Sequence, residues 1–267
     1  MNKEISKERQ EFIKANKKEA LKVKAGQFFL LAFIIFGWQF AADMGRIDTF
    51  IMSSPKDILK TIQELFATRQ LFSNAAITMY ETLVGFLLGL FAGTAAAVAL
   101  WWFPFLNKIT EPYIIILNAM PKVALGPIII IWAGAGMRSI IIMTLLISTI
   151  STVIGIYGGF CDVDEGTLIL LKTFGANKAQ LLFKVLLPAS CNNFISMMKI
   201  NIGLSWVGVI MGEFLVSKAG LGYLIMYGSQ VFNLTLVMTG ILLVSASAAI
   251  MYFAVNFIEK NIRKKLG

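Results

Sequence analysis

Few residues in this 267-residue chain could carry out chemistry. The chain contains no histidine, and the Gly-Lys dipeptide of the usual nucleotide-phosphate loop does not occur in it, so we expect it to bind no ATP of its own. Few acidic residues fall inside apolar segments, and two of them, Glu81 and Glu213, lie near the outer ends of those segments. Cys161 and Cys191 are isolated and are interpreted as packing residues. We therefore expect no catalytic residue, no metal site, no bound cofactor and no enzyme activity.

The composition predicts a membrane protein. Apolar residues make up 57% of the chain and charged residues only 15%, whereas soluble domains have about 45–50% and about 25%. A net charge of +9 in a soluble protein would suggest nucleic-acid binding. Here the Lys and Arg residues gather in tails and loops, which is typical of the cytoplasmic side of a membrane protein. We expect a lipid bilayer as the partner and no nucleic acid.

Several segments are long and apolar enough to cross the hydrocarbon core, which takes about 20 residues. The six predicted crossings are Gln27–Met44, Ala75–Phe103, Ile109–Ala133, Ser139–Phe160, Asn192–Leu215 and Leu234–Ile258. Pro121 and Pro127 lie inside the third, so that crossing should be kinked or interrupted where protein or a cavity faces it. The expected fold class is all-α, a polytopic membrane helix bundle.

The distribution of charge divides the chain and orients it. Met1–Ala25 is polar and rich in Lys and Glu, so we expect a cytoplasmic tail, with the transmembrane domain occupying residues 26–267. No cleavage site of a secretory signal follows the first apolar segment. Lys and Arg are more frequent in the tail, in residues 162–188 and at the C-terminal end than in the intervening loops. This bias predicts that both termini are cytoplasmic.

Two patterns predict local packing. In Asp48–Phe72, Ser54 before Pro55 resembles a helix start, and the apolar residues that follow share one face, so an amphipathic helix on the outer surface is expected. Small residues recurring at every fourth position predict close helix contacts rather than a ligand site. These glycines are Gly85, Gly89 and Gly93 in the second crossing and Gly208 and Gly212 in the fifth.

The segment Asp162–Pro188 is too long and too patterned to be a plain turn. Acidic residues including Glu165 suit a helix start, Gly175 suits the left-handed position after a helix, and Asn177 suits the N-cap of a second short helix. We expect a helix–turn–helix at the cytoplasmic surface that ends at Pro188. From these residues alone, docking to a partner and packing on the bundle are equally supported.

The same segment resembles the "EAA" loop of ATP-binding-cassette (ABC) importer permeases. The matching positions are Gly175, Val185, Leu187 and Pro188, in the runs Phe174-Gly175-Ala176-Asn177 and Val185-Leu186-Leu187-Pro188. The Glu-Ala-Ala positions hold Ile169, Leu170 and Leu171 instead. This departure is common in the branch that includes permeases for nitrate, sulfonate, taurine and thiamine- or riboflavin-type compounds.

Other stretches resemble the same branch between Phe50 and the C-terminus. Ser53-Ser54-Pro55 precedes the surface helix, Met120–Pro127 with Trp132-Ala133-Gly134 is similar to its third-helix signature, and Gly212–Leu215 followed by Gly220–Tyr223 is similar to the signature after its fifth helix. Glu81 stands where arginine is usual in this branch. We expect Glu81 to face the outer headgroup region, with a functional role as the less favoured alternative.

The resemblance implies a type I importer architecture in a bacterial cytoplasmic membrane. Its expected partners are two cytosolic ABC ATPase subunits that hold the ATP, an extracytoplasmic solute-binding protein, and a second permease copy, most simply an identical one. The helix around Thr167–Ala176 would be the coupling helix. The residues implied in ATPase coupling are Glu165, Leu171, Lys172, Phe174, Gly175, Ala176, Asn177 and Pro188.

The third and fifth crossings are expected to line the translocation path of a small polar solute. The candidate residues are Asn118, Met120, Pro121, Asn201, Ser205 and Trp206. For each, hydrogen bonding between helices is the alternative explanation. A competing hypothesis for the whole chain is an ion-coupled secondary transporter. The scarcity of ionisable residues at membrane depth disfavours proton coupling, whereas sodium coupling through backbone carbonyls stays open.

Overall fold

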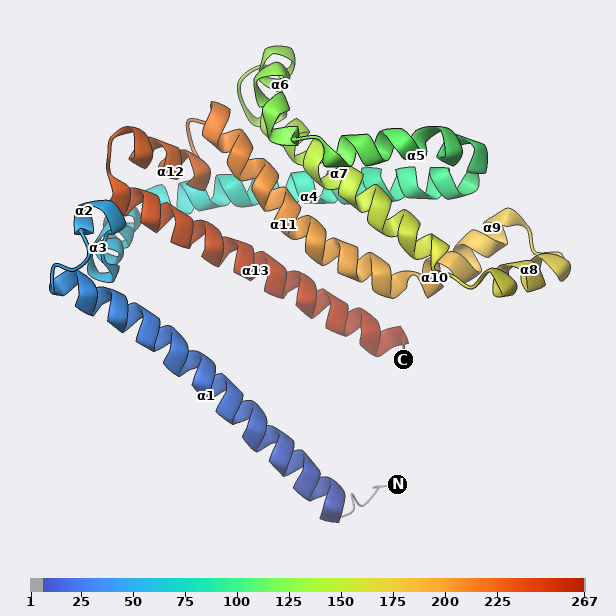
Figure 1. The fold of residues 1–267 in the computed structure, drawn as a ribbon, viewed down its shortest axis with the longest axis horizontal. Helices are drawn as coiled ribbons and strands as arrows, with labels where there is room; N and C mark the ends of the chain where they lie inside the picture. Colours follow the sequence, from blue (N-terminus) through green and yellow to red (C-terminus); the bar gives the residue numbers. More distant parts are fainter. Residues whose placement is uncertain (1–6, 267) are drawn as a thin grey trace.

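The computed structural model describes residues 7–266, and within this range the chain forms helices and no strand (Figure 1). The helices are α1 (Lys7–Asp43), α2 (Thr49–Met52), α3 (Pro55–Ala67), α4 (Gln70–Trp102), α5 (Pro104–Ala119), the 3₁₀ turn η1 (Lys122–Leu125), α6 (Gly126–Ala133), α7 (Met137–Cys161), α8 (Glu165–Thr173), α9 (Lys178–Leu181), the π turn η2 (Leu182–Leu186), α10 (Leu187–Ala189), α11 (Cys191–Val216), α12 (Leu221–Gln230) and α13 (Leu234–Leu266). The expected all-α class is confirmed.

Five helices of the described chain are long and apolar enough to cross a membrane, namely α1, α4, α7, α11 and α13. A sixth candidate is the pair made of Pro104–Ala119 and Lys122–Ala133, which is bent by 89° at its break. The interruption predicted within Ile109–Ala133 from its prolines is therefore confirmed. The bend lies at Pro121, which precedes the 3₁₀ turn, whereas Pro127 occupies the first turn of α6, where a missing N–H leaves no hydrogen bond unmade.

Helix α1 runs through the boundary expected between the tail and the membrane domain, and that division stays a prediction. It runs for 37 residues from Lys7 to Asp43 without interruption, a length of about 55 Å at 1.5 Å per residue. No break marks the predicted boundary at Ala25, and residues 1–6 lie outside the described part. The most apolar stretch of α1 is not buried, and α1 meets α3 only near its end, where Ala42 is buried and Gln39 accepts a hydrogen bond from the Lys56 amide. Figure 1 shows α1 diverging from α13.

Helix α7 lies at the centre of the bundle and packs against both α4 and α11. The glycines of α4 make this contact close, because a Cβ at Gly89 would lie 2.2 Å from Ser148 Oγ and one at Gly85 would lie 2.5 Å from a Thr144 methyl. On the other side of α7, a Cβ at Gly208 would lie 2.6 Å from the Cα of Thr144. The glycine ladders are thus helix-packing devices, as predicted.

The predicted surface helix is α3. Ser54 is its N-cap and accepts a hydrogen bond from the Asp57 amide at 3.2 Å, and Pro55 is its first residue. Ile58 and Leu65 are buried, and Leu65 joins a cluster with residues of α12 and α13. Helices α2, α3 and α12 gather at the end of the bundle opposite to α8 and α9 (Figure 1). Helix α12 was not predicted from the sequence.

Candidate functional site

The hairpin formed by α8 and α9 is the feature of this fold that projects farthest from the bundle at the end where α4 and α7 finish (Figure 1). Asp164 caps α8 by accepting hydrogen bonds from the amide and the hydroxyl of Thr167, at 2.7 and 2.8 Å. These hydrogen bonds lower the pKa of Asp164 below its ordinary value. Glu165 lies in the first turn, where its charge complements the helix dipole.

The turn between the two helices is fixed by its backbone. Gly175 has a φ of +82°, and its amide donates to Lys172 O at 2.9 Å, while the amide of Ala176 donates to Leu171 O at 3.0 Å. Asn177 and Gln180 then form a reciprocal capping box at the start of α9. Both sequence predictions for this turn, the left-handed glycine and the asparagine cap, are confirmed.

The hairpin presents apolar side chains outward. Phe174 is 79% exposed, and Ile169 and Leu170 are more than half exposed. A Cβ placed on Gly175 would meet nothing within 4 Å, so another surface can approach the backbone there. An exposed apolar group of this kind, on a rigid turn, is typical of a protein-interaction site.

The hairpin is anchored to the bundle on its other side. Leu181, Leu182 and Leu186 are buried, and the last two pack with Ala97 of α4 and Phe160 of α7. Lys178 donates to the carbonyl of Trp102 and lies 5.8 Å from the centre of its ring. A displacement of the hairpin must therefore carry the ends of α4 and α7 with it.

A joint connects the hairpin to α11. The π turn Leu182–Leu186 ends just before Pro188. Proline has no N–H to donate, and its ring would clash with a carbonyl of the preceding turn of a regular α-helix, so the wider π turn accommodates it. Ser190 then donates its hydroxyl to Gly159 O at 2.9 Å, and Asn193 donates its amide to Gly155 O at 3.0 Å. These two bonds attach the start of α11 to α7.

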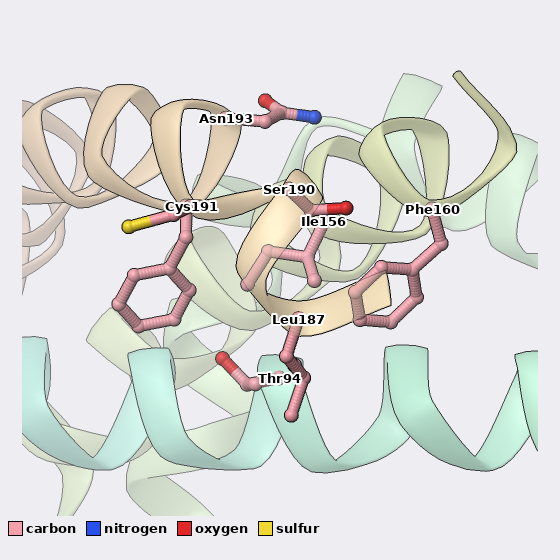
Figure 2. Close-up of a pocket in the computed structure, with 8 residues that line it drawn as sticks. Thr94, Ile156, Phe160, Leu187, Ser190, Cys191 and Asn193 are labelled. Carbon is pink, nitrogen blue, oxygen red and sulfur yellow. The ribbon is translucent and has the colours of Figure 1, made fainter. Parts of the chain in front are cut away.

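A cavity of about 220 Å³ lies beneath this joint. Figure 2 shows Leu187 of the α10 turn next to Thr94 of α4, with Phe160 of α7 at one side, Cys191 at the other and Ile156 of α7 between them. Packing at the joint is therefore looser than in the glycine-lined contacts of α7. A loosely packed joint lets the start of α11 shift relative to the hairpin and the ends of α4 and α7 with less steric resistance.

The predicted coupling residues thus fall into two groups. Glu165, Leu171, Lys172, Phe174, Gly175, Ala176 and Asn177 come together on the hairpin, while Pro188 lies beyond it at the joint. Leu171 and Ala176 are half-buried, and the others are exposed. Their role in coupling stays a prediction.

The predicted path residues are also divided. Asn118 and Pro121 are exposed at the break between α5 and α6, with Met120 half-buried between them, and the Lys122 ammonium donates to Asn118 O at 3.0 Å. Asn201 and Ser205 of α11 are fully buried within the bundle.

Trp206 is also buried, in a cluster with residues of α4 and α13. The side-chain polar atoms of Asn201, Ser205 and Trp206 have no hydrogen-bond partner. The alternative of hydrogen bonding between helices is therefore not realised in this conformation, and the path assignment stays a prediction.

The expectation for Glu81 is wrong. Its side chain is 5% exposed and interacts with that of Glu213. The two residues lie on different helices, α4 and α11, which is why neither crossing alone shows a carboxyl pair. Glu81 therefore points into the bundle rather than toward headgroups.

Glu213 explains the signature that follows the fifth crossing. Its carboxylate accepts hydrogen bonds from Thr78 Oγ1 at 2.6 Å and from the Gly222 amide at 2.5 Å. A Cβ on Gly220 or Gly222 would come within 3 Å of the Glu213 side chain. The glycines therefore let the N-terminus of α12 close onto a buried carboxylate, which satisfies amides that a helix leaves free.

An ion pair in the bundle was missed at the sequence level. Lys199 of α11 lies 2.5 Å from Glu259 of α13. The available signal was a lysine within an otherwise apolar crossing, which marks a buried partner. Among the described residues, no group of three or more His, Cys, Asp and Glu side chains could hold a metal ion.

Comparison with known proteins decides the family. Residues 85–265 match the model of the binding-protein-dependent transport system inner membrane component. This chain belongs to that family. The match covers every element from the glycine ladder of α4 to α13, including the hairpin and its joint.

Curated relatives span nearly the whole permease. Over 83% of its length, this chain is 29% identical to a probable ABC transporter permease protein of Haemophilus influenzae, and the match covers 89% of that protein. It is 26% identical to the putative aliphatic sulfonates transport permease protein SsuC of Bacillus subtilis, over 92% of both chains. These relatives agree with the nitrate and sulfonate branch that the sequence motifs resemble.

Solved structures share its fold. A chain of the inward-facing MetNI methionine ABC transporter superposes with a TM-score of 0.56 at 20% identity, covering 75% of the permease and 96% of that chain. A chain of an amino acid ABC transporter gives 0.57 at 14% identity. The fold is that of a type I ABC importer permease, and the molecule is a multi-pass membrane protein that serves as a transport component.

Proposed function

We propose that the permease forms the translocation path of an ATP-driven importer for a small polar solute. Its partners are two cytosolic ABC ATPase subunits, an extracytoplasmic solute-binding protein and a second copy of itself. The observation that carries this proposal is the α8–α9 hairpin, which is exposed and apolar on one side and anchored to α4 and α7 on the other. A free loop could not transmit force in this way.

The proposed orientation places the hairpin and both termini in the cytoplasm of a bacterial cell, across its cytoplasmic membrane. Lys and Arg residues concentrate at the hairpin end of the chain, which supports this side. The start of α1 and the end of α13 lie toward the same end of the molecule (Figure 1). Helices α3 and α12 then face the solute-binding protein.

In the proposed mechanism, closure of the ATPase dimer on ATP moves the hairpin as a rigid body. ATP, held by the partner and not by this chain, shifts the population only if the two conformations differ in their contacts with the ATPase. Phe174 supplies apolar contact area, and the open backbone at Gly175 allows close approach. The joint at Pro188 passes the motion to α11.

The proposed path runs between the α5–α6 break and α11. Asn118, Met120 and Pro121 border it at the break. In the proposed second conformation Asn201 and Ser205 turn toward the path, which would give their buried polar atoms the partners that they lack. Trp206 would set the width of the path beside them. A cysteine at position 201 should then react with a polar thiol reagent in one nucleotide state and not in the other.

The transport assay separates this proposal from its alternative. The purified permease, its ATPase and its binding protein are reconstituted in vesicles, with aliphatic sulfonates first in the solute panel because relatives carry that name. We expect solute-stimulated ATP hydrolysis and uptake. Uptake driven by a sodium or proton gradient without ATPase would support a secondary transporter instead.

Replacing Gly175 by Trp tests the role of the hairpin. At a φ of +82° a residue with a Cβ is strained by roughly 1–2 kcal/mol, but the side chain meets open space, so the permease should stay folded. Uptake should be lost because the ATPase can no longer approach. Gly26→Trp, in an equally open position on α1, is the control. Normal coupling in the Gly175 variant would exclude the hairpin as the coupling element.

A further inference from the structure

Helix α5 is held away from its neighbours by a crevice. None of its residues is buried, although it contacts both α4 and α7. One cavity of about 320 Å³ lies between α5 and α7, and a second of about 280 Å³ adjoins it toward α4. The two share Leu100, Ile114 and Val153 in their walls, so they form one continuous crevice.

The polar groups of the crevice gather at one end. Asn107 and Glu111 lie in the first two turns of α5, and Tyr157 and Cys161 lie in the last turns of α7. Tyr157 and Cys161 line the same cavity as Asn107 and Glu111, so four hydrogen-bonding or charged side chains meet at this end. This end is the one from which the α8–α9 hairpin projects.

The other end is apolar. Ile114, Val153 and Ile154 line the first cavity toward the middle of the helices. The only polar residue in the wall of the second cavity is Thr110, whose hydroxyl donates to Leu106 O at 2.9 Å and so presents no free donor. The polar residues that line the crevice therefore lie at one end of it, and the apolar residues lie toward the middle of the helices.

Glu111 gives the polar end a definite charge. The carboxylate is exposed, and no Lys or Arg pairs with it among the described residues. An unpaired carboxylate beside neutral hydrogen-bonding groups attracts an ammonium group and repels a phosphate that lacks one. A ligand that fits the crevice has an apolar chain and an amine-bearing head.

We propose that the α5 crevice binds an amine-bearing phospholipid, such as phosphatidylethanolamine, with its acyl chain between α5 and α4 and its ammonium at Glu111. The orientation given in the proposed function places this lipid in the cytoplasmic leaflet of the membrane. Binding itself depends on neither the ATPase nor the solute, so it can fail or succeed independently of the transport proposal.

Native mass spectrometry of the permease tests this site. The protein is extracted from vesicles that contain equal amounts of phosphatidylethanolamine and phosphatidylglycerol, and the retained lipid is counted. We expect wild type to retain phosphatidylethanolamine preferentially, Glu111→Gln to reduce this retention at least fivefold, and Glu111→Lys to reverse the preference. Glu64→Gln, the same change on an exposed carboxylate of α3, should have no effect.

A second variant tests the apolar end. Ile154→Trp fills the cavity and leaves Glu111 in place, so it should also reduce lipid retention. Equal retention of both lipids by wild type, or unchanged retention in the Glu111 variants, would overturn the proposal. So would a change of oligomeric state in Ile154→Trp with the lipid count unchanged, because it would show that a second copy of the chain covers the crevice.

Discussion

Truncation of Phe174 gives the sharpest measure of what the hairpin does. The side chain is 79% exposed, so Phe174→Ala should leave the fold of the permease intact. A Phe side chain offers at least about 150 Å² of apolar surface, and docking could therefore remove roughly 120 Å² from water. At about 25 cal/mol per Å² this amounts to roughly 3 kcal/mol.

Alanine keeps part of this contact area, so the expected loss is about 2 kcal/mol. This corresponds to roughly 30-fold weaker binding to the ATPase. The affinity between the detergent-solubilised permease and its ATPase measures this loss, and the Tm of the permease alone should stay unchanged. Phe50→Ala is the matched control, because Phe50 is 63% exposed on α2 at the opposite end.

Three outcomes would distinguish the explanations. Weaker ATPase binding with an unchanged Tm supports docking by the hairpin. Unchanged binding would refute the reasoning, because an apolar side chain of this exposure at a docking surface must lose contact area on truncation. Equal weakening by Phe50→Ala would point to a general effect of detergent exposure and would also count against the hairpin.

Three further substitutions probe the bundle. Gly89→Leu should destabilise the permease by about 1–3 kcal/mol because its Cβ would lie 2.2 Å from Ser148 Oγ, whereas Gly203→Leu, in open space on α11, should not; thermal unfolding measures both. Glu213→Ala should speed hydrogen exchange in Leu221–Gln230, because it leaves the Gly222 amide without its acceptor; unchanged exchange would contradict the capping role. Lys199→Met should lower the free energy of unfolding by about 1–2 kcal/mol, and Glu259→Leu in the same chain should restore part of it, since breaking this partly buried pair costs more than replacing it; additive losses would contradict this.

Local patterns predicted much of the fold because their causes are local. The cap at Ser54, the left-handed turn at Gly175 and the capping asparagine at Asn177 depend on residues within a few positions of each other. The break at Pro121 follows from the missing N–H of one residue. Each of these features depends on residues that are close in the sequence and not on packing between helices.

The continuity of α1 and the presence of α12 could not be predicted in the same way. Polar residues before Ala25 are compatible with a helix, but nothing in their composition distinguishes a continuation of the crossing from a separate tail. Helix α12 is 10 residues long and begins at a buried carboxylate supplied by α11. Its start is therefore decided by a tertiary contact and not by its own sequence.

The contact between Glu81 and Glu213 could not be predicted from the sequence, whereas the structure of the hairpin could. Glu81 and Glu213 are separated by more than a hundred residues, and only the packing of α4 against α11 brings them together. The motif around Glu213 was recognised as part of a permease signature, yet its contacts hold α12 in place. A family motif in this bundle is thus no evidence of contact with the solute. The hairpin is a stronger functional assignment, because its exposed side chains serve no packing role within the chain.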